Sequence, residues 1–281
     1  GSVKMQPDFD FTSYISRRKG VASQVGIRLQ DYAYLEDIER MRQLSQRDFV
    51  RQGLSLGLQA WKLARMRRIN ANSRLIEADD NVSQIWSDVC AKFRHAPLPL
   101  RIMPMQDDWI VPWGDDGGTF FTLSPRGYAL PTSSMQFIFG RAIGALDNSH
   151  VPWMTITQFV DDLTHGIWNK ATQIPDILLH WSRCAQITQD RAGILASRDI
   201  SGAIYVIMKS SLDWGDDEIM RELRRYHNKQ DVDWGENEVE KRIRAIEIFM
   251  ESRIYRRTAG RSMRDIDEAV QELYAIFSVS R

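Results

Sequence analysis

The chain has 281 residues, of which 43% are hydrophobic, and its 37 Lys and Arg residues are balanced by 37 Asp and Glu residues. This length and hydrophobic content allow one or two domains with a substantial core. The zero net charge gives no support for nucleic acid as a partner, and no run of about 18 apolar residues is present, which excludes a membrane-spanning helix.

The two cysteines indicate a reducing compartment. Cys90 and Cys184 lie on apolar faces of expected helices, far apart in the sequence, so both are predicted to be buried free thiols. The N-terminus has no signal-peptide pattern, and a cytoplasmic location is therefore expected. The Gly-Ser start is typical of a tag-cleavage scar, which leaves open a longer natural chain.

The N-terminal third is predicted to be mostly helical. Residues 1–20 are polar, lack periodicity and are expected to lead into the fold, whereas residues 25–73 have a charged helical pattern. The basic side chains of that stretch are expected to face solvent. A clearer helix follows Asp79 and Asp80, with apolar residues at steps of three and four through residues 82–93.

A small sheet is expected next. Residues 98–105 are predicted to form a strand after Pro97 and Pro99 end the helix. Residues 119–123 and 128–132 are predicted to form a hairpin around Ser124-Pro-Arg-Gly, which has the residue preferences of a type I turn. Residues 114–118 form a Gly-rich turn, but its two acidic residues would repel a phosphate group.

The remaining chain is predicted to be helical. Met135, Phe139, Ala142 and Leu146 recur at helical spacing and indicate a buried helix. A second core helix is expected over residues 174–195, with Pro175 in its first turn. Further helices are expected over residues 203–208 and 216–226. Two more should follow, over 239–254 and from Ser262 to 277, the last capped by Ser262.

The two core helices carry a resemblance to a known family. Residues 137–146 and 181–195, together with His150, resemble the gluzincin metallopeptidase family of the CAAX prenyl endopeptidases and the heat-shock protease HtpX, and especially its soluble bacterial members. The resemblance extends over residues 31–197. It implies an α+β fold, namely a mainly helical zincin-like domain with a small mixed sheet.

The resemblance also implies that the family's zinc site has been lost. The family's first core helix carries a His-Glu-x-x-His motif, whose two histidines bind zinc from one helix face. Arg141 and Ala145 stand where those histidines are, Ala142 stands where the catalytic glutamate is, and Gln186 stands where the glutamate ligand is. Asp190, which supports the metal site in the family, is retained.

These four replacements remove both the ligands and the general base. A catalytic zinc site needs about three protein ligands to bring the pKa of its water to about 7. The guanidinium of Arg141 has no lone pair to offer, and Ala142 and Ala145 have no donor atom. The neutral amide of Gln186 is a poor zinc ligand. Hence neither a metal nor another cofactor is expected.

Two alternatives remain open for Arg141. Its guanidinium either replaces the metal by pairing with Asp190 and the amide of Gln186, or it points to solvent. His180 and Cys184, four residues apart, have metal-ligand spacing, but packed side chains on a core helix are the expected explanation. Cys184 is not expected to act as a nucleophile, because its neighbours indicate burial.

The sequence thus predicts a domain of residues 21–200 with a helical part, residues 201–281, packed on it. The expected function is that of a pseudoprotease, a protein- or peptide-binding scaffold without hydrolytic activity and of unspecified oligomeric state. The resemblance also implies that the strand of Thr119, Phe120, Phe121 and Thr122 offers an edge to which a peptide could pair. The alternatives are an active metallohydrolase with other ligands, and a sensor that binds a small molecule or nucleotide in the vacated cleft.

Overall fold

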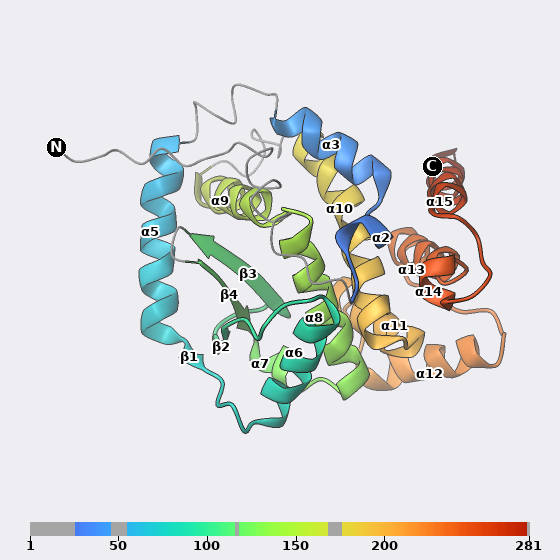
Figure 1. Ribbon diagram of the computed structural model, residues 1–281, viewed down its shortest axis with the longest axis horizontal. Coiled ribbons are helices and arrows are strands. Elements are labelled where there is room, and N and C mark those ends of the chain that lie inside the picture. The colour runs from blue at the N-terminus through green and yellow to red at the C-terminus, as the bar shows by residue number, and fades with distance from the viewer. Residues whose placement is uncertain (1–25, 46–54, 116–117, 168–175, 280–281) are drawn as a thin grey trace.

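A computed structural model of the chain describes residues 26–45, 55–115, 118–167 and 176–279, which form a mainly helical α+β fold with one small mixed sheet (Figure 1). This fold class is the predicted one. The expected N-terminal lead-in and Pro175 lie outside the described residues. Within the described ranges, no helix combines the length and the apolar character needed to cross a bilayer.

The N-terminal helices confirm the helical reading of residues 25–73 where the structure describes them. They are α2 (Leu29–Tyr32), α3 (Leu35–Ser45) and α5 (Ser55–Asn72). Helix α6 (Asn81–Lys92) begins where Asp80 accepts a 2.8 Å hydrogen bond from the backbone N–H of Val82, as expected of an N-cap aspartate. Its apolar face, which includes Trp86, is buried in the main core.

The sheet consists, within the described residues, of four strands in the order β1-β2-β4-β3. These are β1 (Arg74–Leu75), β2 (Leu100–Ile102), β3 (Ile110–Asp115) and β4 (Gly118–Leu123). Strands β2 and β4 are parallel, whereas the other two pairs are antiparallel, so the sheet is mixed. The predicted strand over residues 98–105 is therefore present but shorter.

The predicted hairpin over residues 119–132 is wrong. The observed hairpin joins β3 to β4, and residues 125–128 form the single helical turn α7 (Pro125–Tyr128). Ser124 acts as N-cap, since its hydroxyl accepts a 2.9 Å hydrogen bond from the N–H of Gly127, and Pro125 occupies the first helical position. The same residues that suit a turn therefore start a helix.

The predicted peptide-binding edge at Thr119, Phe120, Phe121 and Thr122 is also wrong as an edge. These residues lie in β4, which is an interior strand between β2 and β3. Phe121 and Thr122 pair with β2 on one side and β3 on the other, whereas Thr119 and Phe120 pair with β3. At Phe121 and Thr122 the ladder thus already uses the backbone groups that an incoming peptide would need.

Helices α8 (Thr132–Asp147) and α10 (Asp176–Ser197) form the centre of the molecule. Helix α8 packs against α10, α6 and β3. The two central helices approach closely through small residues, since a Cβ at Gly140 would come within 2.6 Å of the Ala196 Cβ. Between them in sequence lies α9 (Val151–Ile167).

The C-terminal helices share the main core. They are α11 (Ile200–Ser211), α12 (Asp216–His227), α13 (Asn237–Phe249), α14 (Arg253–Arg256) and α15 (Met263–Val279). Ile204, Val239 and Ile266 belong to the same buried cluster as Trp86 and Phe139. Figure 1 shows α13, α14 and α15 on the opposite side of α10 from the sheet. Residues 201–279 thus contribute to the same core as the preceding helices.

Two helix boundaries in this part can be compared with the predicted ones, namely the start of α15 and the end of α13. The hydroxyl of Ser262 accepts a 3.2 Å hydrogen bond from the N–H of Asp265, which confirms the predicted cap. The helix predicted over residues 239–254 is instead interrupted after α13. There the hydroxyl of Ser252 accepts a 3.1 Å hydrogen bond from the N–H of Tyr255 and begins α14. A serine cap thus starts a new helical turn.

Candidate functional site

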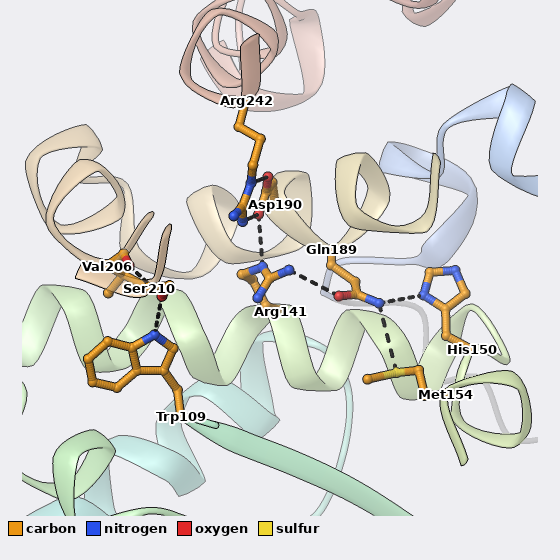
Figure 2. Close-up of polar contacts among 9 residues, drawn as sticks. All are labelled: Trp109, Arg141, His150, Met154, Gln189, Asp190, Val206, Ser210 and Arg242. Atoms are coloured by element: carbon orange, nitrogen blue, oxygen red, sulfur yellow. Dashed lines mark hydrogen bonds and ion pairs between the residues drawn. The ribbon is translucent and has the colours of Figure 1, made fainter. Parts of the chain in front are cut away.

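A cluster of one carboxylate and two guanidinium groups lies between α8, α10 and α13. Arg141 Nε donates a 2.8 Å hydrogen bond to Oδ1 of Asp190, and Arg242 donates to both carboxylate oxygens, from Nε at 3.0 Å and from Nη2 at 2.9 Å. Figure 2 shows Asp190 held between the two arginines. We call these three residues the ion cluster. It joins three helices through one buried anion.

The Arg141–Asp190 contact settles the two alternatives for Arg141 in favour of pairing. The carboxylate side chain of Asp190 is only 4% exposed, and the side chain of Arg141 is 22% exposed. Gln186, the other expected partner, is partly exposed, and the amide that reaches Arg141 belongs instead to Gln189, at 3.1 Å from Nη2. The expected pairing of Arg141 with the Gln186 amide is therefore corrected to Gln189.

Burial and neighbouring charge act on Arg141 in opposite directions. Burial lowers the pKa of its guanidinium, the carboxylate of Asp190 raises it, and the cation of Arg242 lowers it. An arginine remains protonated under such influences because its unperturbed pKa lies above about 12. Arg141 is therefore a permanent cation, which neither accepts a proton nor coordinates a metal.

A second set of buried polar residues continues from the ion cluster toward α3. Gln189 Nε2 lies 3.0 Å from His150 Nδ1, and His150 Nε2 lies 2.7 Å from Oδ2 of Asp37. The hydroxyl of Thr188 donates to the same Oδ2 at 2.8 Å. His150, Asp37 and Thr188 are fully buried. We call Gln189, His150, Asp37 and Thr188 the histidine network.

The hydrogen bond that Arg141 donates to Gln189 sets the directions of the other hydrogen bonds in this network. Arg141 can only donate, so the amide of Gln189 turns its oxygen toward Arg141 and its NH₂ group toward His150. His150 Nδ1 then accepts, and a proton on Nε2 faces the carboxylate of Asp37. One continuous chain of polar contacts thus links Arg242 on α13 to Asp37 on α3.

A further buried cation ties α10 to the last helix. Arg191 is 1% exposed, and its Nη1 lies 2.8 Å from Oδ1 of Asp267 on α15. The guanidinium also lies over the rings of Tyr34 and Phe249, at 5.1 and 5.4 Å from their centroids. Consecutive residues of α10, Asp190 and Arg191, therefore hold α13 and α15 respectively.

The other residues singled out in the sequence, Ala142, Ala145, His180 and Cys184, lie on α8 and α10. Ala142 and Ala145 are buried on α8, at 5% and 1% exposure. His180 is exposed, whereas Cys184 is partly buried, and burial, followed by the charge of Asp37, raises the pKa of the Cys184 thiol to about 12. In the described part of the chain, no group of three or more His, Cys, Asp or Glu side chains is arranged to hold a metal ion.

The arrangement has limited chemical capacity. The carboxylate of Asp190 is fully engaged by two arginines, and the imidazole of His150 has both nitrogens engaged and no exposed surface. A general acid or base must come within hydrogen-bond reach of a substrate. These groups instead hold helices together, which is the role that their contacts support.

The sequence predicts Arg141 and Asp190 as site residues but not Arg242, Gln189 or Asp37. Arg242 is 52 residues from Asp190 and lies on an amphipathic helix whose partner cannot be read from periodicity. Gln189 could have been found, because it is adjacent to Asp190 on the helix that faces Arg141. Asp37 carried no signal, since charged residues are frequent in its segment.

Comparison of the chain with protein-family models, with curated proteins and with solved structures gives no significant match. The resemblance described above therefore rests on the residues of the chain itself.

Proposed function

We propose that this chain is a catalytically inactive, metallopeptidase-like protein with a zincin-like fold, which acts by binding another protein or a peptide. The observation that carries the proposal is the contact of Arg141 with Asp190. By the resemblance, Arg141 stands where the family has its first zinc-binding histidine, and this permanent cation pairs with Asp190, which the resemblance identifies as a retained residue. This pairing makes a second, divalent cation at the same place electrostatically unfavourable.

Two further features support the same proposal. Ala142 and Ala145 offer no donor atom to a metal ion, and both are buried on α8. Gly140, Gly144 and Gly193 let the two helices approach so closely that a Cβ at any of them would lie within 2.7 Å of a neighbouring atom. The two helices are thus closely packed and ion-paired where the resemblance would place a metal site.

If a peptide pairs with the sheet, the route must differ from the predicted one. Strand β3 is the longer of the two strands at the ends of the described sheet, and it pairs with β4 alone. Pro112 lies in its middle and lacks an N–H group, which is usual in edge strands. Peptide addition in this proposal therefore takes place at β3.

The test combines metal analysis, hydrolysis and binding. Protein purified without chelator should contain far less than one zinc per chain and should leave casein uncleaved, with or without added zinc. Panning a random peptide library against the folded chain should select a common motif, and amide exchange in β3 should slow when that peptide binds. Stoichiometric zinc with cleavage that a chelator abolishes would overturn the proposal, and so would a library that yields no selected motif.

A further inference from the structure

A second feature of the molecule, remote from the ion cluster, is a cavity of about 380 Å³ where α6, α10 and α14 end. Three of the residues that line it carry a positive charge, namely Lys92, Arg198 and Arg257. Gly26, Ile27 and Leu195 complete the lining. Among the described residues, the lining thus contains three cations and no carboxylate, and the cavity volume is in the range of small-molecule sites.

The three cations lie close enough to influence one another. Burial lowers the pKa of Lys92, and the charges of Arg198 and Arg257 lower it further, whereas Asp88 raises it. Burial, and then the charge of Arg257, lower the pKa of Arg198. Like charges gathered in this way are mutually unfavourable in the unliganded protein. An anion placed between them would relieve that repulsion.

The negative C-terminal ends of the helices offset only part of this positive charge. Lys92 is the last residue of α6, and its Nζ donates a 2.8 Å hydrogen bond to the carbonyl of Ala196. Arg198 follows α10 and donates from Nη1 to the carbonyl of Tyr255 at 2.7 Å. The ends of α6, α10 and the short α14 each contribute at most about half a negative charge, against three full positive charges. An excess of about one and a half to two positive charges remains.

The cations also keep donors available. Lys92 has three N–H donors and Arg198 has five, and each is seen to use one on a carbonyl. Within the described residues, the side chain of Arg257 makes no hydrogen bond or ion pair. Arg257 has a left-handed backbone conformation, with φ of 59°, at the end of α14.

We propose that this cavity is a binding site for a small phosphate monoester, with the phosphate between Lys92, Arg198 and Arg257 and the carbon part of the ligand against Ile27 and Leu195. A monoester carries close to two negative charges at neutral pH, which matches the excess positive charge. The apolar pair provides a wall that inorganic phosphate could not use. This inference does not depend on the proposed function.

Phenyl phosphate is a suitable probe, because it combines a dianionic phosphate with an apolar ring. Titration calorimetry should give a dissociation constant on the order of 0.1–1 mM at low salt, weakening as potassium chloride is raised. Inorganic phosphate should bind more weakly, and benzoate, with one charge, should bind more weakly still. No heat and no thermal shift with phenyl phosphate at concentrations of about 10 mM would overturn the inference.

A matched pair of variants locates the site. Arg257→Gln should weaken phenyl phosphate binding about tenfold or more, since it removes a charge-assisted contact. Arg256→Gln, which changes an exposed neighbour on the same helical turn outside the cavity lining, should alter it less than about twofold. Equal effects of the two changes would show non-specific charge attraction and would refute the site. Circular dichroism and melting temperature check that both variants fold.

The same chemistry could be presented by a lipid headgroup, and a second arm distinguishes the sources. Vesicles containing phosphatidic acid are compared with vesicles of phosphatidylcholine alone in a sedimentation assay. Binding of phenyl phosphate without vesicle binding supports a soluble ligand, whereas binding to phosphatidic acid that Arg257→Gln abolishes supports a headgroup. Vesicle binding that survives Arg257→Gln, with no response to phenyl phosphate, would refute the site.

Discussion

Arg242 on α13 and Arg141 on α8 share the carboxylate of Asp190 on α10, with three N···O distances of 2.8 to 3.0 Å. One anion thereby connects three helices, and each arginine lies about fifty residues from Asp190 in the sequence. Because Asp190 is almost completely buried, its charge is costly without both partners, and the two arginines are costly without it. The cluster should therefore be a major determinant of how these helices assemble.

The first prediction concerns this anion. Asp190→Asn keeps the shape of the side chain but leaves two neighbouring guanidinium groups without their counter-charge, so the free energy of unfolding should fall by about 3–5 kcal/mol. Arg141→Met should cost less, because Arg242 would still donate two hydrogen bonds to Asp190. Urea titrations followed by circular dichroism measure both.

An exposed ion pair provides the control for that experiment. Arg264 and Glu268 pair at 3.3 Å, but their side chains are 88% and 59% exposed, so Glu268→Gln should have no measurable effect. If Asp190→Asn lowered the free energy of unfolding no more than Glu268→Gln does, the ion cluster would not contribute to stability, and it could not replace a metal ion as a link between the helices.

The contact of Arg141 with Asp190 is one of the two alternatives that the sequence leaves open, because a buried carboxylate needs a partner but no local pattern decides whether Arg141 supplies it or points to solvent. The apolar spacing predicted α6, α8 and α10, since periodicity depends on local burial alone. The partner choice of α13 could not be predicted in this way. Arg242 is one of several basic residues in its segment, and only the packing of α13 on α10 selects it.

The errors in the sheet have a different origin. Ser124-Pro125 suits both a turn and a helix start, and only the contacts of the following residues decide between them. The resemblance implied that β4 forms an edge, and the sequence could not correct this because strand order is not encoded locally. It is fixed by the parallel pairing of β4 with β2, which is brought about by the connection through β3.

The second prediction concerns the histidine network. His150→Phe keeps an aromatic ring beside Trp181, whose centroid lies 5.5 Å away, but removes the hydrogen bonds to Asp37 and Gln189. The buried carboxylate of Asp37 would then keep only its contact with Thr188. The free energy of unfolding should fall by about 3 kcal/mol, as measured by urea titration.

His95 supplies the comparison for His150. It pairs with Asp147 at 2.6 Å, but the two side chains are 22% and 13% exposed, so water can replace part of the lost contact. His95→Phe should therefore be less destabilising than His150→Phe. A larger effect at His95 would contradict the view that complete burial makes the histidine network costly to break.

The third prediction concerns the thiols. Burial raises the pKa of Cys184 to about 12 and that of Cys90 to about 11, so very little thiolate exists in the folded protein at pH 8. Iodoacetamide should label both residues much more slowly in the native protein than in urea, as followed by mass spectrometry. Rapid native labelling of Cys184 at pH 8 would contradict its assignment as an unreactive thiol.

The same shifts set the sign of a pH dependence. A thiol whose pKa is raised on folding favours the folded state while it is protonated, so this contribution is complete below the ordinary value of 9.0. It is lost as the pH rises from there through about 12. Cys184→Ser should therefore lose less stability than the unchanged protein between pH 9 and the alkaline limit of the measurement, whereas an equal or steeper loss would count against the shift.

The fourth prediction tests the close approach of α8 and α10. A Cβ at Gly140 would lie 2.6 Å from the Ala196 Cβ and 2.7 Å from the carbonyl oxygen of Ala192, and backbone atoms cannot yield without moving a helix. Gly140→Ala should destabilise by about 2 kcal/mol, because overpacking of up to about 3 kcal/mol exceeds the gain of about 1 kcal/mol in helix propensity. At Gly215 an added Cβ meets no atom within 4 Å, so Gly215→Ala should change stability by less than about 1 kcal/mol. Gly215→Ala serves as the control for the substitution itself. A melting temperature of Gly140→Ala at or above that of the unchanged protein would contradict the close approach of α8 and α10, and with it the packing that holds Arg141 against Asp190.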